Sequence, residues 1–265
     1  MKKTAKPSFG PRTFEKLGDI LRTYPHEAFR LFVACAACAL AAGQREDDYR
    51  QLVAPYKPAQ IQALSDTFAE FIAAAELNDF RDVMGPVHME LGSKSAQRSN
   101  GEFYTPYDVC RLMARLTVTD VTIPVDRPLL IQEPCTGAGQ MVLCAAEELI
   151  SIRGLCSCLN IYVEAWDVSP LACDMSFINF TLHGIPAEVV HGNSLSYEVY
   201  GRRRNIFHPL ATGLAQPHEL AALNIMRQAS AIATLVPETD PLAPAAVIAA
   251  PDIILDRKGQ VLMDI

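Results

Sequence analysis

Two different spacings of apolar residues divide the chain. Over residues 14–21 and 64–75, apolar side chains recur at every third or fourth position, a spacing that predicts helices. Prolines at positions 25, 55, 58 and 86 fall where these helices are expected to begin or end. We therefore predict a helical N-terminal region, residues 1–92, whose apolar faces make core or partner contacts.

A polar stretch follows, residues 93–100, and we predict that it is an exposed loop. Pro106 is well placed for the first turn of another helix. The helical spacing of Leu112, Met113 and Leu116 predicts that these three side chains form its buried side.

In the middle of the chain, strand and helix patterns alternate. The expected strands are residues 129–131, 160–166 and 187–191, and the expected helices are residues 138–150 and 170–183. Repeated strand–helix units predict an α/β fold with a parallel sheet that is covered on both faces. Ligands of such sheets bind beyond the carboxyl ends of the strands.

The pattern weakens after Tyr200. We predict a basic loop over residues 201–205, a helix over 217–233 and a β-hairpin near 253–263. The basic loop contains three arginines, residues 202–204. Such a run is most often a solvated loop, although arginines are also able to contact phosphate. The predicted organisation is a helical region (1–92), an α/β ligand-binding domain (93–200) and a divergent C-terminal segment (201–265).

Charge and cysteine content narrow the class of protein. The chain has 265 residues and a formal net charge of −7, which argues mildly against strong independent binding to DNA. The closely spaced cysteine pairs 35/38 and 156/158 have no second pair or histidines at zinc-site spacing. We expect reduced thiols in a cytoplasmic protein, with no metal site.

No segment of the helical region is typical of a targeting signal or a membrane span. Residues 1–7 are basic, but no apolar core of a signal peptide follows them. The longest apolar run, residues 31–42, is too short to cross a bilayer and is typical of a buried helix. We therefore expect no membrane partner.

The most informative segment is Glu-Pro-Cys-Thr-Gly-Ala-Gly at residues 133–139, between an expected strand and an expected helix. A glycine turn at this place puts backbone N–H groups at a helix N-terminus, where they bind anionic or polar ligands. Val142 stands where a dinucleotide fingerprint has its third glycine or alanine, which disfavours a dehydrogenase. By itself the turn is as easily explained by strand–helix packing.

Two further segments are weak signals when taken singly. Asp167 ends the second expected strand, where an acid binds ribose hydroxyls in nucleotide-binding folds. Its alternative role is to cap the next helix, although Ser169 is better placed for that. The hexapeptide Gly-Glu-Phe-Tyr-Thr-Pro at residues 101–106 places an aromatic ring and a hydroxyl upstream of the turn, but taken alone it is better explained as a helix-entry loop.

In combination, these segments become specific. With His-Gly-Asn-Ser-Leu at residues 191–195, their order and spacing resemble the adenine-specific DNA methyltransferases, most closely the modification subunits of type I restriction systems. Residues 179–185 and 82–90 also resemble segments of that family. The resemblance covers residues 80–200 and implies a Rossmann-like S-adenosylmethionine-dependent methyltransferase sheet, incomplete or altered, behind the helical region.

The resemblance also implies roles for individual residues, all in binding S-adenosylmethionine. Tyr104, Thr105 and Pro106 would line the cofactor pocket. Glu133, Pro134, Gly137 and Gly139 would hold the methionine end, with Glu133 near the amino group. Asp167 would bind the ribose hydroxyls, and Asn193 would face the adenine ring.

Two departures from the family pattern bear on function. Asn193 replaces the usual Asp and is a weaker acceptor for an adenine amino group, so affinity for the cofactor is expected to be reduced. The catalytic tetrapeptide [DNS]-P-P-[YF], which orients the target amine and stacks on the flipped base, is missing, because the chain contains no Pro-Pro pair. Catalytic residues are therefore not assigned.

Three hypotheses remain. The chain is an adenine-specific DNA methyltransferase or its cofactor-binding half, with DNA as the partner that the resemblance implies. Alternatively, it is a non-catalytic protein of methyltransferase fold that binds cofactor or pairs with, or acts against, a restriction–modification subunit. The third is a truncated remnant with no activity. The acidic balance and the missing tetrapeptide favour the second over unaided methyl transfer.

Overall fold

The computed structural model describes residues 9–92, 104–118, 121, 128–153 and 161–211. The chain divides into two compact units, Met1–Arg227 and Gln228–Ile265, and all described residues belong to the first. The loop expected over 93–100, the helix over 217–233 and the hairpin near 253–263 lie outside the described residues. No helix within the described ranges is long and apolar enough to cross a membrane.

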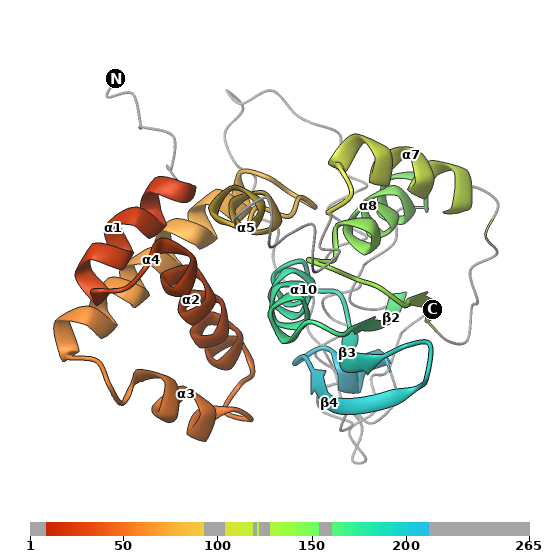
Figure 1. The fold of residues 1–265 in the computed structure, drawn as a ribbon. Coiled ribbons are helices and arrows are strands. Elements are labelled where there is room, and N and C mark those ends of the chain that lie inside the picture. Colours follow the sequence, from red (N-terminus) through yellow and green to blue (C-terminus); the bar gives the residue numbers. More distant parts are fainter. Residues whose placement is uncertain (1–8, 93–103, 119–120, 122–127, 154–160, 212–265) are drawn as a thin grey trace, which may run out of the picture. The chain divides into compact units, whose positions relative to one another are not determined.

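The predicted N-terminal helices are confirmed (Figure 1). They are α1 (Pro11–Leu21), α2 (Pro25–Leu40), α3 (Glu46–Val53), α4 (Pro58–Glu76) and α5 (Gly85–Leu91). Three of them begin at a proline, whose fixed φ and missing N–H suit a first helical position. The fully buried rings of Phe14, Phe29, Phe32 and Phe71 pack together and form the core between α1, α2 and α4.

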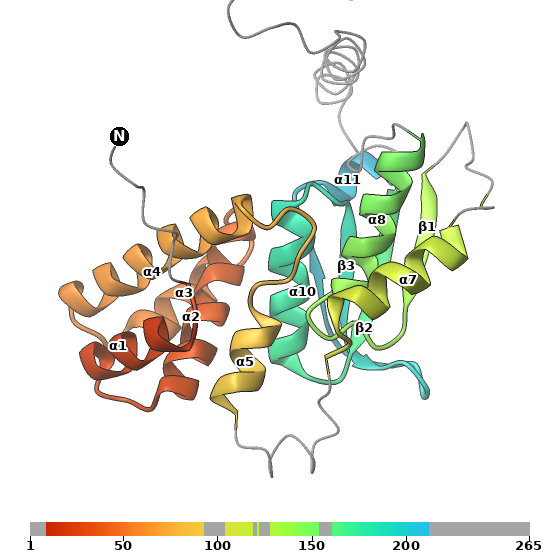
Figure 2. The same cartoon turned by 90° about the horizontal axis from the view of Figure 1, so that it is seen from above.

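The three predicted strands are also confirmed, and they pair in parallel. The sheet has the order β1 (Leu129–Glu133), β2 (Ile161–Asp167), β3 (Ala187–Asn193) and β4 (Glu198–Arg204). Helices α8 (Gln140–Arg153) and α10 (Pro170–Leu182) connect the parallel strands (Figure 2). This is a mixed sheet in an α/β fold.

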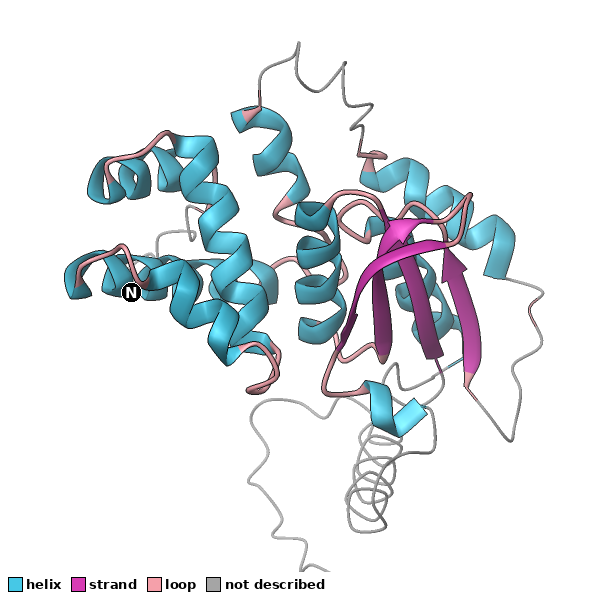
Figure 3. Cartoon of the chain, turned by 60° about the horizontal axis from the view of Figure 1, so that its bottom comes forward, coloured by secondary structure: helices cyan, strands magenta, loops and turns pink. Residues whose placement is uncertain are grey.

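Helix α10 lies at the centre of the described structure, between the sheet and the N-terminal helices (Figure 3). It contacts β2 and β3 on one side and α2 on the other. Because both sides are covered, every residue from Leu171 to Thr181 is buried. The helix therefore lacks the single apolar stripe of a surface helix.

The prediction of a basic loop over residues 201–205 was wrong. Those arginines belong to β4, which pairs antiparallel with β3 and crosses the domain boundary predicted at residue 200. Arg202 and Arg204 both bind the buried carboxylate of Glu188, at 2.7 and 2.6 Å. Arg203 binds Asp174, at 2.7 Å. Neutralisation by acids distant in the sequence makes a run of three arginines compatible with a strand.

Asp174 also joins the sheet to the N-terminal helices. Its Oδ1 accepts hydrogen bonds from Arg45 Nη1 at 2.9 Å and from Arg203 Nε at 2.7 Å. Arg45 directly precedes α3, Asp174 lies on α10, and Arg203 lies on β4. One carboxylate shared by two guanidinium groups thus ties three elements together.

The helix predicted after Pro106 is confirmed as α7 (Tyr107–Val118), but its predicted buried side was wrong. Leu112, Met113 and Leu116 are exposed, by 59, 44 and 76%. The buried side chains are Cys110, Ala114 and Val118, and Cys110 and Ala114 pack with Cys144 of α8. Small side chains at this interface let the two helices approach closely. A spacing argument that looks only for large apolar residues selects the wrong face.

We predict a pH-dependent contribution of Glu188 to stability. Burial raises the pKa of Glu188, but hydrogen bonds and charges from Arg204 and Arg202 outweigh this effect, and the net pKa is lowered. The stabilisation from this carboxylate is therefore complete above the pKa of the unfolded chain and is lost as the pH falls through the lower folded-state value. Urea unfolding of Glu188→Gln at pH 7 should show a clear loss of stability, and the difference from wild type should shrink towards pH 3.5. A loss of the same size at both pH values would contradict the ion-pair account.

Candidate functional site

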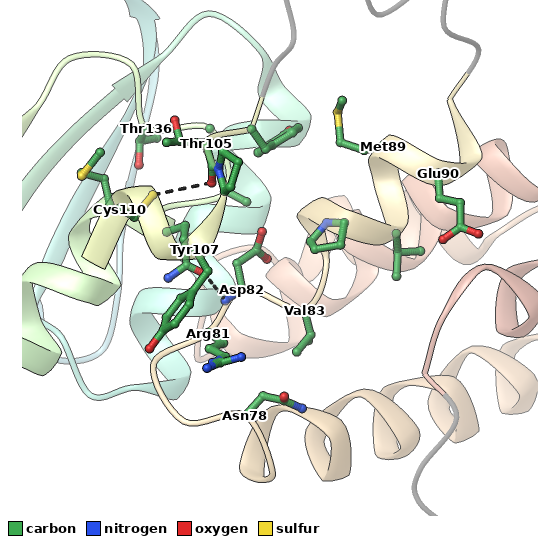
Figure 4. Close-up of a pocket in the computed structure, with 18 of the residues that line it drawn as sticks. Asn78, Arg81, Asp82, Val83, Met89, Glu90, Thr105, Tyr107, Cys110 and Thr136 are labelled. Atoms are coloured by element: carbon green, nitrogen blue, oxygen red, sulfur yellow. Dashed lines mark hydrogen bonds between the residues drawn. The ribbon is translucent and has the colours of Figure 1, made fainter. Parts of the chain in front are cut away.

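A pocket of about 660 Å³ lies beyond the carboxyl end of β1 (Figure 4). Its volume is within the range of small-molecule sites. Three stretches supply most of the lining: residues 78–90, residues 104–110 and residues 133–141. The residues of the predicted cofactor site that line it are Tyr104, Thr105, Pro106, Glu133 and Gly137. The four remaining predicted residues, Pro134, Gly139, Asp167 and Asn193, are not part of its lining.

The glycine turn forms the floor of the pocket. Gly137 and Gly139 have φ values of +53° and +88°, a region that side-chain-bearing residues rarely adopt. A Cβ on Gly139 would lie 2.7 Å from Cε1 of Phe180, on the buried helix α10. Gly139 therefore allows the turn to pack closely against α10. Gly137, by contrast, lines the pocket.

Tyr104 joins the segment after residue 103 to the turn. A Cβ on Gly137 would lie 3.2 Å from Tyr104 Cε1, so the tyrosine ring lies over this glycine. The ring also makes an edge contact with His88 of α5, with 5.8 Å between centroids. Two segments that the sequence analysis linked only by resemblance thus meet at one point.

Two polar residues of the segment 133–139, Glu133 and Thr136, line this pocket and have unused bonding capacity. Glu133 Oε1 accepts one hydrogen bond, from Cys135 N at 3.1 Å, and the carboxylate has further lone pairs for a cation. Thr136 is 6% exposed, and its Oγ1 has no hydrogen-bond partner among the described residues. A buried hydroxyl without a partner is costly and marks a place where a ligand or water completes the bonding.

Asp167 and Asn193 are engaged by the backbone. Asp167 Oδ2 accepts a hydrogen bond from Gly137 N, and its Oδ1 accepts one from Ser169 N, each at 2.9 Å. Ser169 caps α10 through its own hydroxyl, which accepts from Ala172 N. Asn193 Oδ1 accepts from the N–H groups of Leu195 and Ser196, at 3.0 and 3.3 Å. Asp167 therefore anchors the glycine turn, and Asn193 shapes the turn between β3 and β4.

A buried carboxylate, that of Asp82, holds the lining of the pocket together through hydrogen bonds. Asp82 accepts hydrogen bonds from Met84 N, Gly85 N and Asn179 Nδ2, at 2.9 to 3.1 Å. Burial raises its pKa, while these hydrogen bonds lower it; the net shift is upward. The Asn179 amide also donates to the carbonyl oxygen of Ala138 in the glycine turn, at 2.8 Å. One amide thus connects α10 to both walls of the pocket.

Gln140 and His183 extend this network. Gln140 accepts from Asp82 N at 2.8 Å and donates to Phe80 O at 3.1 Å. His183 Nε2 accepts from Phe80 N at 3.0 Å, so its Nδ1 carries the proton that bonds Asn179 O at 2.8 Å. Segments 82–90 and 179–185 belong to the family resemblance, which implied no role for Asp82, Asn179 or His183. Their contacts give a structural reason for both segments.

This arrangement combines a strand–glycine turn–helix unit, an acid at the end of the second strand and an aromatic ring over the turn. Residues 80–210 match the family model for N-6 DNA methylase. The match supports an adenine DNA methyltransferase family for this part of the chain, as the motifs indicated. No curated protein matches the chain. The matched range contains α7, the whole described sheet and every predicted cofactor residue.

We predict that Asn179→Ala destabilises the fold strongly. The substitution leaves the buried Asp82 carboxylate and the Ala138 carbonyl oxygen without the amide donor, which should cost roughly 2–4 kcal/mol. Chemical denaturation measures the loss. Gln62→Ala is the control, because the Gln62 amide is exposed and donates to Asp66, four residues along the same helix. Equal, small effects of the two variants would contradict the role given to the network.

Gly139→Ala should also be destabilising, by about 1–3 kcal/mol, because the new Cβ meets both a positive φ and the Phe180 ring. Thermal unfolding checks this, with Gly43→Ala as the control. Gly43 has a similar positive φ of +83° but open space around its Cβ position. A larger loss for Gly139→Ala than for Gly43→Ala is the expected result, and equal losses would show that packing against Phe180 contributes nothing.

Proposed function

We propose that this chain binds S-adenosylmethionine in the 660 Å³ pocket and serves as the cofactor-binding half of an N6-adenine DNA methylation system, similar to a type I modification subunit. The observation that carries the proposal is the buried hydroxyl of Thr136, a residue that lines the pocket; this hydroxyl has no partner among the described residues. The family match to residues 80–210 supports the choice of ligand, because N6 DNA methyltransferases generally use S-adenosylmethionine.

The residues that line the pocket fit this cofactor. Glu133 offers an acceptor for the amino group, and Thr136 offers a hydroxyl to a polar atom of the methionine end. Tyr104 offers an aromatic face beside Gly137. When bound, S-adenosylmethionine supplies an electrophilic sulfonium methyl group. The chain's own contribution is to bind and orient it.

The proposal keeps Asp167 as the partner of the ribose and Asn193 as the partner of the adenine ring, although part of the hydrogen-bonding capacity of both side chains is already used. Each side chain already accepts two backbone hydrogen bonds. A carboxylate has about four acceptor sites, so Asp167 has room for ribose hydroxyls. The Asn193 oxygen has two lone pairs, and both are engaged, which reinforces the expectation of reduced affinity.

The second candidate function is a non-catalytic cofactor-binding or interaction subunit of a restriction–modification system. The observation that favours it is the absence of any Pro-Pro pair, and with it the acceptor tetrapeptide, from the 265 residues. Recognition of the target base needs polar acceptors for its amino group and an aromatic ring for stacking. We therefore propose that transfer to DNA requires a partner subunit.

Calorimetric titration with S-adenosylmethionine tests cofactor binding. We expect saturable binding to the wild-type chain and at least about tenfold weaker binding to Thr136→Val, since one buried hydrogen bond is lost. Thr136→Val should leave the unliganded stability unchanged or increased, because it removes an unsatisfied hydroxyl. Thr117→Val, on the outer face of α7, is the control. Asp167→Ala should abolish binding, and thermal unfolding of the unliganded variant measures how much of that loss comes from damage to the backbone, because the N–H groups of Gly137 and Ser169 bond the two Asp167 oxygens.

The absence of heat from millimolar cofactor with the folded wild-type chain would contradict the proposal. A transfer assay with unmethylated DNA and labelled cofactor separates the two candidates. The second candidate predicts cofactor binding without incorporation of label by this chain alone. Incorporation without a partner would favour a complete enzyme.

A further inference from the structure

The pocket contains a cation to which neither the sequence analysis nor the family match assigns a role. Arg81 lines the pocket and is the only lysine or arginine among its described lining residues. Its guanidinium carbon lies 4.0 Å from the centroid of the Tyr107 ring, in a cation–π contact (Figure 4). None of the ion pairs between described residues includes Arg81.

The position of the guanidinium matters for its chemistry. Stacking on Tyr107 uses the flat face of the group and leaves its N–H edges free to donate. The Tyr107 ring is itself held, because its hydroxyl donates to Glu147 Oε2 of α8 at 3.2 Å. A guanidinium fixed in this way is preorganised for an anion, and its forked donors match a carboxylate.

The charges of the acids in the pocket lining indicate which group of the cofactor Arg81 binds. Asp82 is committed to Met84, Gly85 and Asn179, whereas Glu90 is exposed and Glu133 has acceptor capacity left. The proposed cofactor carries two positive groups, a sulfonium and an ammonium, and one negative group, a carboxylate. The carboxylates of Glu90 and Glu133 suit the two positive groups of the cofactor. Arg81, the single lysine or arginine among the described lining residues, suits its carboxylate.

Resting on the proposed function, we infer that Arg81, stacked on Tyr107, binds the carboxylate of the cofactor's methionine end and selects ligands that carry an intact amino-acid group. Arg81 is then a determinant of ligand specificity. Its removal changes which ligand is preferred, and the fold stays intact because its side chain is exposed.

The test compares S-adenosylmethionine with its decarboxylated analogue, which differs only in lacking the carboxylate. Binding of both ligands is titrated into the wild-type chain, Arg81→Ala, Arg81→Lys and the control Arg111→Ala. Arg111 is exposed on α7 and does not line the pocket. Circular dichroism of each variant checks that it is folded.

We expect the wild-type chain to prefer S-adenosylmethionine by roughly tenfold or more, as one charge-assisted contact implies. Arg81→Ala should lose this preference while keeping its affinity for the decarboxylated analogue, and Arg81→Lys should keep part of it. Arg111→Ala should behave as wild type. Tyr107→Leu, which removes the stacking surface, should reduce the preference in the same direction.

A preference that survives Arg81→Ala, or a variant that weakens both ligands equally, would overturn the assignment of Arg81 while leaving the proposed function in place. Binding of neither ligand by the wild-type chain would overturn the proposed function and this inference together. The comparison of the two ligands on the wild-type chain thus separates the two failures.

Discussion

The structure of the pocket depends on a buried carboxylate. Asp82 is removed from water, and an isolated carboxylate in such a place would be costly. Backbone N–H groups from the start of α5 and the amide of Asn179, 97 residues further along the chain, offset part of that cost. The same amide bonds the glycine turn at Ala138. The walls of the pocket are therefore fixed relative to each other by a fully bonded polar network, which defines a single geometry more sharply than apolar packing does.

This network separates the polar groups of the site into two kinds. Asp82 and Asn179 have their hydrogen bonds within the protein and give the site its shape. Thr136, Glu133 and Arg81 line the pocket and have unused bonding capacity. A preorganised frame with a few unsatisfied groups is the expected condition of a binding site, because the protein needs little rearrangement when a ligand arrives.

Most of the fold was predictable because its signals are local. Alternating strands and helices, a glycine turn and prolines at helix starts are each encoded within about ten residues, and the structure has them in the predicted places. The fourth strand was not predictable in this way. Its arginines are stabilised by Glu188 and Asp174, whose positions beside β4 follow only from the tertiary fold.

In the candidate site, too, local motifs were predictable from the sequence and long-range contacts were not. Motifs identified the glycine turn and Tyr104, which meet in the structure. The residues whose hydrogen bonds fix the shape of the pocket could not be identified from the sequence, because their partners are distant along the chain. Asp82 N bonds Gln140, 58 residues away, and Phe80 N bonds His183, 103 residues away. The exposed side of α7 was misassigned for a related reason, since small residues at a helix interface carry little hydrophobic signal. Long-range pairing, which no short motif encodes, decided each of these features.

The most direct test of the account is a crystal structure of the chain grown with S-adenosylmethionine. The account predicts the ligand in the pocket between Tyr104 and the glycine turn, with the Thr136 hydroxyl and a Glu133 carboxylate oxygen within hydrogen-bond distance of its methionine end. It also predicts that Asp82 and Asn179 keep their present contacts. A ligand bound elsewhere, or one that leaves the Thr136 hydroxyl without a partner, would contradict the central claim that this pocket is the cofactor site.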